Sequence, residues 1–186
     1  MPTNEVKNRT LALVDKYQKL IGGLLGIEPR LIRFFVKAGA NNKEMEIGLE
    51  YQPDEDKKDW IEFQSWCEGD FVVKRMDDAA SKSHPANYWD LVISTFKLYR
   101  MPHCCGIVVS CNANVRETYR HKRVGTVLNN LRQDIARMLG YTVMLCTDIA
   151  QNEHQRRLLK TNGWKDVLDF KNRRTGNTVI LSYIGL

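Results

Sequence analysis

The segment from residue 104 to residue 139 most constrains the fold, because it predicts a strand, a tight basic turn and a helix in succession. Residues 104–115, CCGIVVSCNANV, are typical of a strand. Residues 126–139 repeat apolar side chains at helical spacing, and Gly140 suits the end of that helix. A strand that turns sharply into a helix gathers unpaired backbone N–H groups at the positive end of the helix dipole, which favours binding of a phosphate group.

The residues that follow continue the same alternation. Residues 141–147 predict a strand, and residues 149–161 predict a short helix that ends at Asn162-Gly163. Two further strands, at residues 165–170 and 178–184, are joined by the turn KNRRTGN. The C-terminal half therefore predicts the order β-α-β-α-β-β.

The N-terminal half begins with helical patterns. Residues 4–25 place apolar side chains at steps of three and four, which predicts an amphipathic helix. Pro29 suits the start of a second short helix over residues 31–39. The alternating segments that predict strands are residues 45–51, 60–66 and 71–76.

Residues 79–86 predict a loop, and residues 87–100 are ambiguous. Trp89, Val92 and Phe96 fit one helical face, whereas the isoleucine and valine content also suits a strand. We predict a helix over residues 87–100, ended by Pro102.

Length and composition indicate one globular domain. The chain has 186 residues, of which 43% are hydrophobic and 27% charged. The sequence contains neither an apolar run of the roughly 18 residues that suggest a membrane span nor a secretory pattern at its N-terminus. Its five cysteines, an odd number at irregular spacing, suit reduced thiols. We therefore expect a cytoplasmic protein without membrane association.

The positive charge is concentrated in the C-terminal half. Residues 1–100 contain 15 Lys and Arg against 16 Asp and Glu, whereas residues 101–186 contain 13 against 6. The first half therefore has a net charge of −1 and the second half a net charge of +7, which together give the net charge of +6. Such a surface suits an anionic partner, either a nucleotide cofactor or a nucleic acid.

The basic turn resembles the pyrophosphate-binding motif of the GNAT family, the acetyl-CoA-dependent N-acetyltransferases. That family carries Arg/Gln-x-x-Gly-x-Gly/Ala, often with Tyr before it and a small residue and Leu after it. This chain has Arg120-His121-Lys122-Arg123-Val124-Gly125, with Tyr119 before it and Thr126 and Leu128 after it. Arg123 replaces the middle glycine, which matters if that position needs a positive φ angle.

A second segment is similar to the same family. The family shows Asn, then Ala, Leu, Tyr, Gly and Phe at three, six, seven, eleven and twelve residues further on. Here Asn152 is followed at those spacings by Gln155, Leu158, Leu159, Gly163 and Trp164. Asn, Leu, Gly and the aromatic residue match, whereas Ala and Tyr do not.

The resemblance covers about residues 104–186 and implies an α/β fold with a mixed, splayed central sheet flanked by helices, here with an added N-terminal helical segment. It implies one domain: N-terminal helices (1–40), a variable acceptor-side half (41–103) and an acetyl-CoA-binding half (104–186). Acetyl-CoA is the implied cosubstrate, with no metal. Its implied ligands are the backbone of Ala113 and Val115 at the thioester, Asn152 at the pantetheine arm, and the turn residues Arg120, His121, Lys122, Arg123, Val124, Gly125 and Thr126.

The chemistry has fewer candidates. Leu159 stands where the family has its general-acid Tyr, and Tyr141 or Tyr183 could replace that acid. Asp148 is a candidate base or amine-binding carboxylate, although Asp148 and Gln151 also fit a helix-capping box. Glu117 is a second candidate base.

Metal binding and cysteine chemistry are not expected. Zinc at His103, Cys104, Cys105 and Cys111 is disfavoured because adjacent strand cysteines face opposite sides. A nucleophilic Cys111 or Cys146 is disfavoured because the family reacts by direct transfer.

The main hypothesis is an acetyl-CoA-dependent N-acetyltransferase that acts on a primary amine of a small molecule, a peptide or a protein. Two alternatives stay open. One is a catalytically inactive GNAT-like binding module, and the other is a GNAT-like protein that binds or modifies nucleic acid. The N-terminal helix also fits a homodimer contact.

Overall fold

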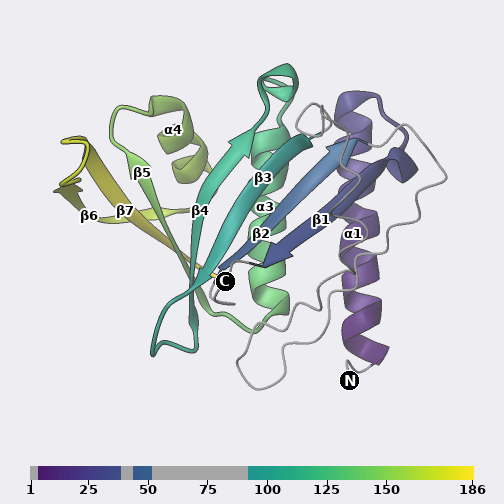
Figure 1. Cartoon of the computed structure of the whole chain (residues 1–186), viewed down its shortest axis with the longest axis horizontal. Coiled ribbons are helices and arrows are strands. Elements are labelled where there is room, and N and C mark those ends of the chain that lie inside the picture. The colour runs from purple at the N-terminus through teal and green to yellow at the C-terminus, as the bar shows by residue number, and fades with distance from the viewer. Residues whose placement is uncertain (1–3, 39–43, 52–91) are drawn as a thin grey trace.

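One mixed sheet organises the part of the chain that the computed structural model describes, residues 4–38, 44–51 and 92–186 (Figure 1). Seven strands lie in the order β1-β2-β3-β4-β5-β7-β6. The elements in chain order are α1 (Asn4–Leu25), β1 (Ile32–Ala38), β2 (Glu44–Tyr51), β3 (Val92–Arg100), β4 (Ile107–Val115), α3 (Val124–Met138), β5 (Val143–Ile149), α4 (Glu153–Thr161), β6 (Lys165–Lys171) and β7 (Thr178–Gly185). The expected mixed sheet with flanking helices and an added N-terminal helix is confirmed.

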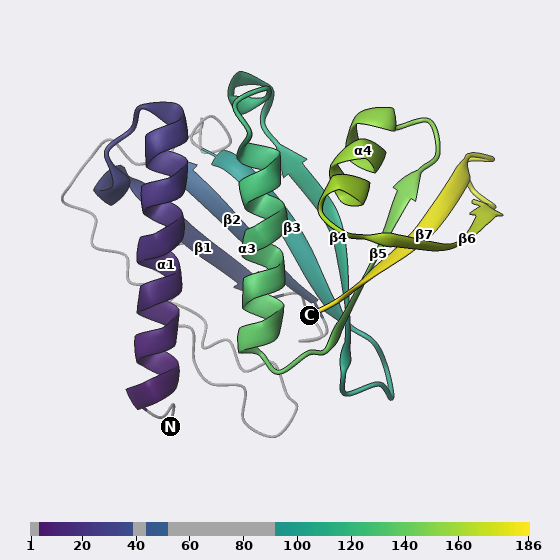
Figure 2. The same ribbon diagram turned by 180° about the vertical axis from the view of Figure 1, so that it is seen from behind.

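The helices α1 and α3 lie side by side on one face of the sheet, and α4 lies on the same side of the C-terminal strands (Figure 2). Every described strand pair is antiparallel except β4 and β5, which are joined by the crossover helix α3. The predicted order β-α-β-α-β-β is therefore confirmed, and each of these elements begins or ends within four residues of its predicted bounds.

The core lies between this helical layer and the sheet. Tyr17 and Ile21 of α1 and Leu131 and Ile135 of α3 are almost fully buried. They belong to the same apolar cluster as the strand side chains on the helical face, among them Ile47, Leu49, Phe96, Leu98, Val108 and Met144. Burial of these side chains is the main force that holds the helices on the sheet.

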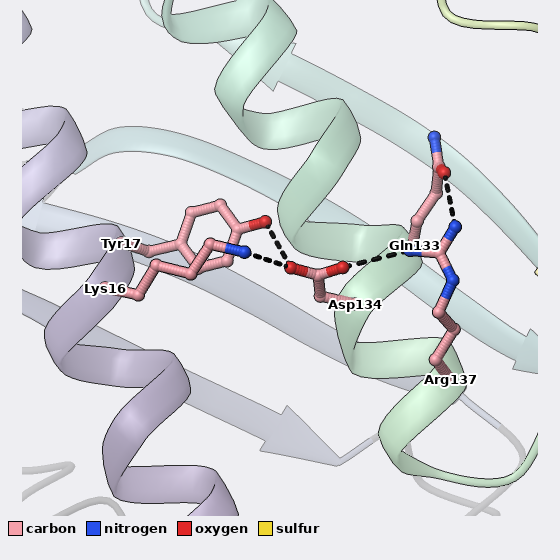
Figure 3. A network of polar contacts seen from close by, with 5 residues as sticks. All are labelled: Lys16, Tyr17, Gln133, Asp134 and Arg137. Carbon is pink, nitrogen blue, oxygen red and sulfur yellow. Dashed lines mark hydrogen bonds and ion pairs between the residues drawn. The ribbon is translucent and has the colours of Figure 1, made fainter.

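Polar contacts fix α1 against α3 (Figure 3). Asp134 of α3 accepts hydrogen bonds from Lys16 Nζ at 2.7 Å and from the Tyr17 hydroxyl at 2.8 Å. Arg137 donates to the other oxygen of Asp134 at 3.0 Å and to Gln133 at 3.3 Å. Because Tyr17 is 1% exposed, its hydroxyl group needs a hydrogen-bond partner, which Asp134 provides. This bond helps to fix the position of α1 along the axis of α3.

The helix predicted over residues 31–39 is wrong. Pro29 does start a helical turn, but it lasts only from Pro29 to Leu31, and β1 follows directly. Ile32 and Phe34 are buried and Arg33 between them is less so, which is the two-residue period of a strand. The β-branched Ile32 and the aromatic Phe34 suit a strand and override the helical signal of the proline.

The helix predicted over residues 87–100 is also wrong over residues 92–100, the part of it that the structure describes. Residues 92–100 form β3, between β2 and β4, and residues 87–91 lie outside the described residues. From Ser94 onward, buried and half-buried residues alternate as in a strand. Val92, Ile93 and Phe96 are also spaced as on one face of a helix, and this spacing imitated a helix. The strands predicted at residues 60–66 and 71–76 and the loop at 79–86 also lie outside the described residues.

Candidate functional site

The strands β4 and β5 form a fork. They pair in parallel over only four residue pairs, from Ile107 with Val143 to Ser110 with Cys146. Beyond that point β5 remains paired with β7 as far as Ile149, while β4 continues along β3 as far as Val115. The carboxyl ends of two parallel strands therefore separate, which is the splay expected from the resemblance and the usual position for a ligand in such sheets.

A β-bulge bends β4 just after the fork opens. Asn112 and Ala113 together oppose the single residue Phe96 of β3, and Asn112 has a φ angle of 51°. A bulge of this kind leaves an extra backbone group outside the ladder and redirects the strand. Ala113, whose backbone is predicted to contact a thioester, therefore lies at an irregular position in the strand. Val115, the second predicted backbone contact, pairs regularly with Ser94.

The basic turn connects the end of β4 to the start of α3. It contains a short helical turn, Glu117–Tyr119, and then residues 120–123. Arg123 is the N-cap of α3 and has φ 62° and ψ 7°, so the position where the family has glycine is left-handed here as well. The side chains of Arg120, His121, Lys122 and Arg123 are all exposed, and Arg120 Nε donates to the Val115 carbonyl at 3.0 Å.

Gly125 lies where the start of α3 meets α4 and β4. A β-carbon added to it would lie 3.4 Å from Leu158 Cδ1 of α4 and 4.0 Å from Val115 Cγ2 of β4. Both distances are ordinary van der Waals contacts, so packing within the described residues does not by itself require a glycine at this position. The rings of His121 in the turn and His154 in α4 have centroids 6.4 Å apart, so the two helix starts face the same region.

Asn152 is the N-cap of α4. Its Oδ1 accepts from the Gln155 amide at 3.2 Å, and its Nδ2 donates to Asp148 Oδ1 at 3.4 Å. The alternative that Asp148 and Gln151 form a capping box is therefore wrong, because the helix begins four residues later than Asp148 requires. The predicted contact of Asn152 with the pantetheine arm stays a prediction.

Asp148 lies near the carboxyl end of β5 and is half-buried. Burial raises the pKa of this carboxyl above its ordinary value, although the Ile149 amide, Arg156, Asn152 and Arg132 act in the opposite direction. Its Oδ2 is buried and has no hydrogen-bond partner among the described residues. Glu117, the second candidate base, is exposed at the start of its helical turn.

The replacements considered for the missing tyrosine differ in position. Leu159 is 2% exposed and belongs to the core. Tyr141 is buried before the start of β5, where burial raises its pKa, and Tyr183 lies on β7 opposite Leu145 of β5. The register puts Tyr183 on the opposite face of the sheet from Cys146, and thus away from α3 and α4.

Within the described ranges, no group of three or more His, Cys, Asp or Glu side chains is arranged to hold a metal ion. His103 and Cys104 lie in the connection from β3 to β4, together with the exposed Cys105. Cys146 is buried, and burial raises the pKa of its thiol to about 12, which disfavours the thiolate. No described helix is long and apolar enough to cross a membrane.

Sequence reasoning missed three buried polar residues beneath the fork, Ser110, Asn129 and Arg132. They meet Trp164, the aromatic residue of the second family-like segment, whose contact with Asn129 was not predicted. A signal was present, because Arg132 comes one residue after Leu131 and four after Leu128, both on the apolar face of the predicted helix. A charged residue at that spacing indicates burial with partners.

Comparisons with known proteins agree on the fold. No family model matches the sequence, and a search of curated proteins found no match. The structure resembles the spermidine/spermine N-acetyltransferase SpeG from Vibrio cholerae, with 12% identity, a TM-score of 0.51, and coverage of 78% of this chain and 69% of that one. It also resembles a probable acetyltransferase from Staphylococcus epidermidis, with 11% identity, a TM-score of 0.50, and coverage of 79% and 71%.

A third structure, Ard1 from Thermoplasma volcanium, is 13% identical with a TM-score of 0.48, and the match spans 52% of this chain and 64% of Ard1, less than two thirds of its length. The SpeG and Staphylococcus epidermidis structures share the fold of this chain, as the resemblance to the GNAT family implied. At these identities the likeness concerns the fold alone.

Proposed function

We propose that this chain is a coenzyme A-dependent N-acyltransferase that moves an acetyl group from acetyl-CoA to a primary amine. The observation that carries the proposal is the fork between β4 and β5, which opens toward the start of α3. A ligand with a pyrophosphate at one end and a thioester at the other fits a site with a basic helix start at its rim and an irregular strand backbone inside.

The turn supplies the anion-binding part. Thr126 N donates to the Arg123 carbonyl at 3.1 Å, whereas Val124 N and Gly125 N, in the same first turn of α3, have no hydrogen-bond acceptor among the described residues. The exposed Arg120, Lys122 and Arg123 add positive charge beside them. The net charge of the second half of the chain then serves coenzyme A, which is strongly anionic. Nucleic acid remains an alternative anionic partner, which salt-dependent binding of DNA or RNA would reveal.

The chemical step needs a neutral amine close to the thioester. The amine nitrogen attacks the thioester carbonyl carbon, the carbon–sulfur bond breaks, and the sulfur leaves as a thiolate that takes a proton from water. Asp148 binds the amine and accepts the proton that its nitrogen loses. The backbone of the β4 bulge at Ala113 stabilises the carbonyl oxygen as negative charge develops on it.

A catalytically inactive binding module is the second candidate. The observation that favours it is Leu159, a core residue where the resemblance expects a tyrosine acid. Release of free thiol from acetyl-CoA in the presence of a panel of amines distinguishes the two, because a binding module releases none above the rate in buffer.

The first experiment is isothermal titration with acetyl-CoA, with CoA and ATP as comparisons. We expect micromolar binding of acetyl-CoA. The double variant Lys122→Ala/Arg123→Ala is expected to bind several-fold more weakly, in a way that salt diminishes. The double variant Arg173→Ala/Arg174→Ala removes the same charge from the exposed β6–β7 turn and is the matched control. Equal losses in both variants, or no binding by the unmodified protein, would refute the assignment of the turn.

A further inference from the structure

A group of polar side chains lies buried directly beneath the fork. Arg132 and Asn129 of α3 are each 2% exposed, Ser110 of β4 is fully buried, and Trp164, which precedes β6, is 4% exposed. We call these four residues the fork cluster. Three segments far apart in the sequence thus meet at the point where β4 and β5 separate.

One oxygen organises the fork cluster. Asn129 Oδ1 accepts from Arg132 Nη2 at 2.6 Å, from Arg132 Nε at 3.2 Å and from Trp164 Nε1 at 3.1 Å. Arg132 Nη1 donates to Ser110 Oγ at 3.4 Å, and the guanidinium lies over the Trp164 ring, 4.9 Å from its centroid. Three donors on one oxygen fix the orientation of the Asn129 amide, since the flipped amide would oppose donors to donors.

The charge of Arg132 is costly in this position. Its partners within the described ranges are neutral oxygens and an aromatic ring, with no carboxylate in direct contact. Asn129 Nδ2 is buried without a partner among the same residues. Burial of an ion costs several kcal/mol, and an apolar side chain of similar size often serves stability as well or better. Stability therefore gives a poor account of Arg132.

The strand register shows what Arg132 faces. Ser110, Cys146, Ser182 and Asp166 are consecutive cross-strand partners on β4, β5, β7 and β6, so they form one row on the helical face of the sheet. Asp148 follows Cys146 by two residues on β5 and therefore points to the same face. Arg132, bonded to the first member of the row, lies beside the fork's base, and Asp148 stands one step further into its opening.

Asp148 is flanked by charge from each neighbouring element. Two arginines act on its carboxylate: Arg132 belongs to α3, and Arg156 belongs to α4, where it also pairs with Asp166 at 2.7 Å. Asp169 of β6 occupies the same row as Asp148, separated from it by Ile180. Burial raises the pKa of Asp148, and Arg156 and Arg132 both act to lower it. Arg156 forms an ion pair with Asp166, whereas Arg132 has no carboxylate partner in the part of the chain that the structure describes.

We propose that Arg132 is a positioning residue of the acyl-transfer site, which presents its buried positive charge to Asp148 and so keeps that carboxylate ready to receive the acceptor amine. This inference rests on the proposed function. It attributes the acidic limb of the profile of kcat/KM against pH to Arg132, which contacts neither substrate. It also gives a reason for the positive charge buried under the fork.

The experiment compares the unmodified protein with Arg132→Met, which removes the charge at similar size, and Arg132→Lys, which retains it. Asn129 Oδ1 keeps its bond from Trp164 in both variants, whereas the buried Ser110 Oγ loses its Arg132 donor in Arg132→Met. The carboxyl carbon of Asp148 is titrated by NMR, and kcat/KM for acyl transfer is measured against pH. In Arg132→Met we expect both midpoints to rise by about half a pH unit or more. In Arg132→Lys we expect a much smaller shift.

Arg137→Met is the matched control, because it removes an arginine from the same helix but on the side facing α1, where Arg137 bonds Asp134 and Gln133. Its midpoints should stay in place. The inference is overturned if the Asp148 midpoint does not move in Arg132→Met, or if it moves and the kcat/KM profile does not follow. Absence of transfer by the unmodified protein instead refutes the proposed function, and the NMR titration then still reports whether the two charges are coupled.

Discussion

Replacement of Arg123 by glycine should make the protein more stable and its cofactor binding weaker. Arg123 caps α3 with φ 62° and ψ 7°, a left-handed conformation that crowds the β-carbon of any residue except glycine. The side chain itself is exposed and belongs to the basic turn. The substitution therefore relieves backbone strain in the folded state and removes one positive charge from the proposed phosphate site.

The two effects have similar size and opposite sign. The left-handed conformation costs an L-residue about 1–2 kcal/mol. Glycine returns roughly 0.5–1 kcal/mol of this through the greater freedom of the unfolded chain. We therefore expect Arg123→Gly to raise the free energy of unfolding by about 0.5–1 kcal/mol. Loss of one exposed cation should weaken binding by about 0.2–1 kcal/mol, or up to about fivefold, at low salt.

Urea unfolding followed by circular dichroism measures the first effect, and titration with acetyl-CoA measures the second. Arg123→Ala separates them, because alanine removes the same charge but keeps the strain. His121→Gly provides an internal comparison, since His121 also has a φ angle of 62°. It should gain similar stability without loss of an arginine.

The reasoning fails if Arg123→Gly is no more stable than Arg123→Ala, because the left-handed backbone would then carry no strain. The binding part fails separately if Arg123→Ala binds acetyl-CoA as tightly as the unmodified protein at low salt.

Other predictions concern the helices. Burial and the bond to Asp134 raise the pKa of Tyr17, so the folded protein retains a proton that the unfolded chain releases near pH 10. The free energy of unfolding should therefore fall above pH 10, and it should fall less in Tyr17→Phe. Urea unfolding measured at a series of pH values will test this. Burial alone would raise the pKa of Asp134, but Lys16, Tyr17 and Arg137 outweigh it and lower the pKa. Its contribution is thus present above about pH 4 and lost as pH falls through the lowered value, and Asp134→Asn should flatten the acid limb of the same unfolding curve. Asn152→Ala removes the cap of α4 and should lower the free energy of unfolding, measured by urea titration, by about 1 kcal/mol, whereas Asn152→Ser should restore most of it.

The C-terminal half of the fold was predictable because each element carries its own local signal. The helix α3 has an apolar stripe and a closing glycine, and the turns at residues 162–163 and 171–177 contain the residues that such turns require. Local signals of this kind do not depend on the rest of the chain. They placed the basic turn between β4 and α3 and the end of α4 correctly, although α4 begins at Glu153 rather than at residue 149.

The N-terminal strands were less predictable because their structure depends on neighbours far away in the sequence. β3 becomes a strand by pairing with β2 and β4. Its sequence alone fits either state, since Val92, Ile93 and Phe96 suit one helical face, whereas Phe96 and Leu98 alternate with Thr95, Lys97 and Tyr99 as in a strand. β1 likewise needs the edge of β2, and Pro29 before it supplied a helical signal that lasts for only one turn.

The fork itself shows why the candidate site was found only in part. Its opening depends on where β4 and β5 stop pairing, a property of register that no single segment encodes. The two carboxyl ends can separate because each strand has another neighbour, β3 for β4 and β7 for β5, so neither loses its ladder. The space beneath is then closed by α3 and Trp164, and α3 places Asn129 and Arg132 where its stripe would otherwise be apolar. The basic turn at the rim of the fork follows from local sequence. The buried charge of Arg132, in contrast, gains a role only because the strand register puts Asp148 on the same face of the sheet. We therefore expect preference for the acceptor amine to depend more on the fork cluster than on the basic turn.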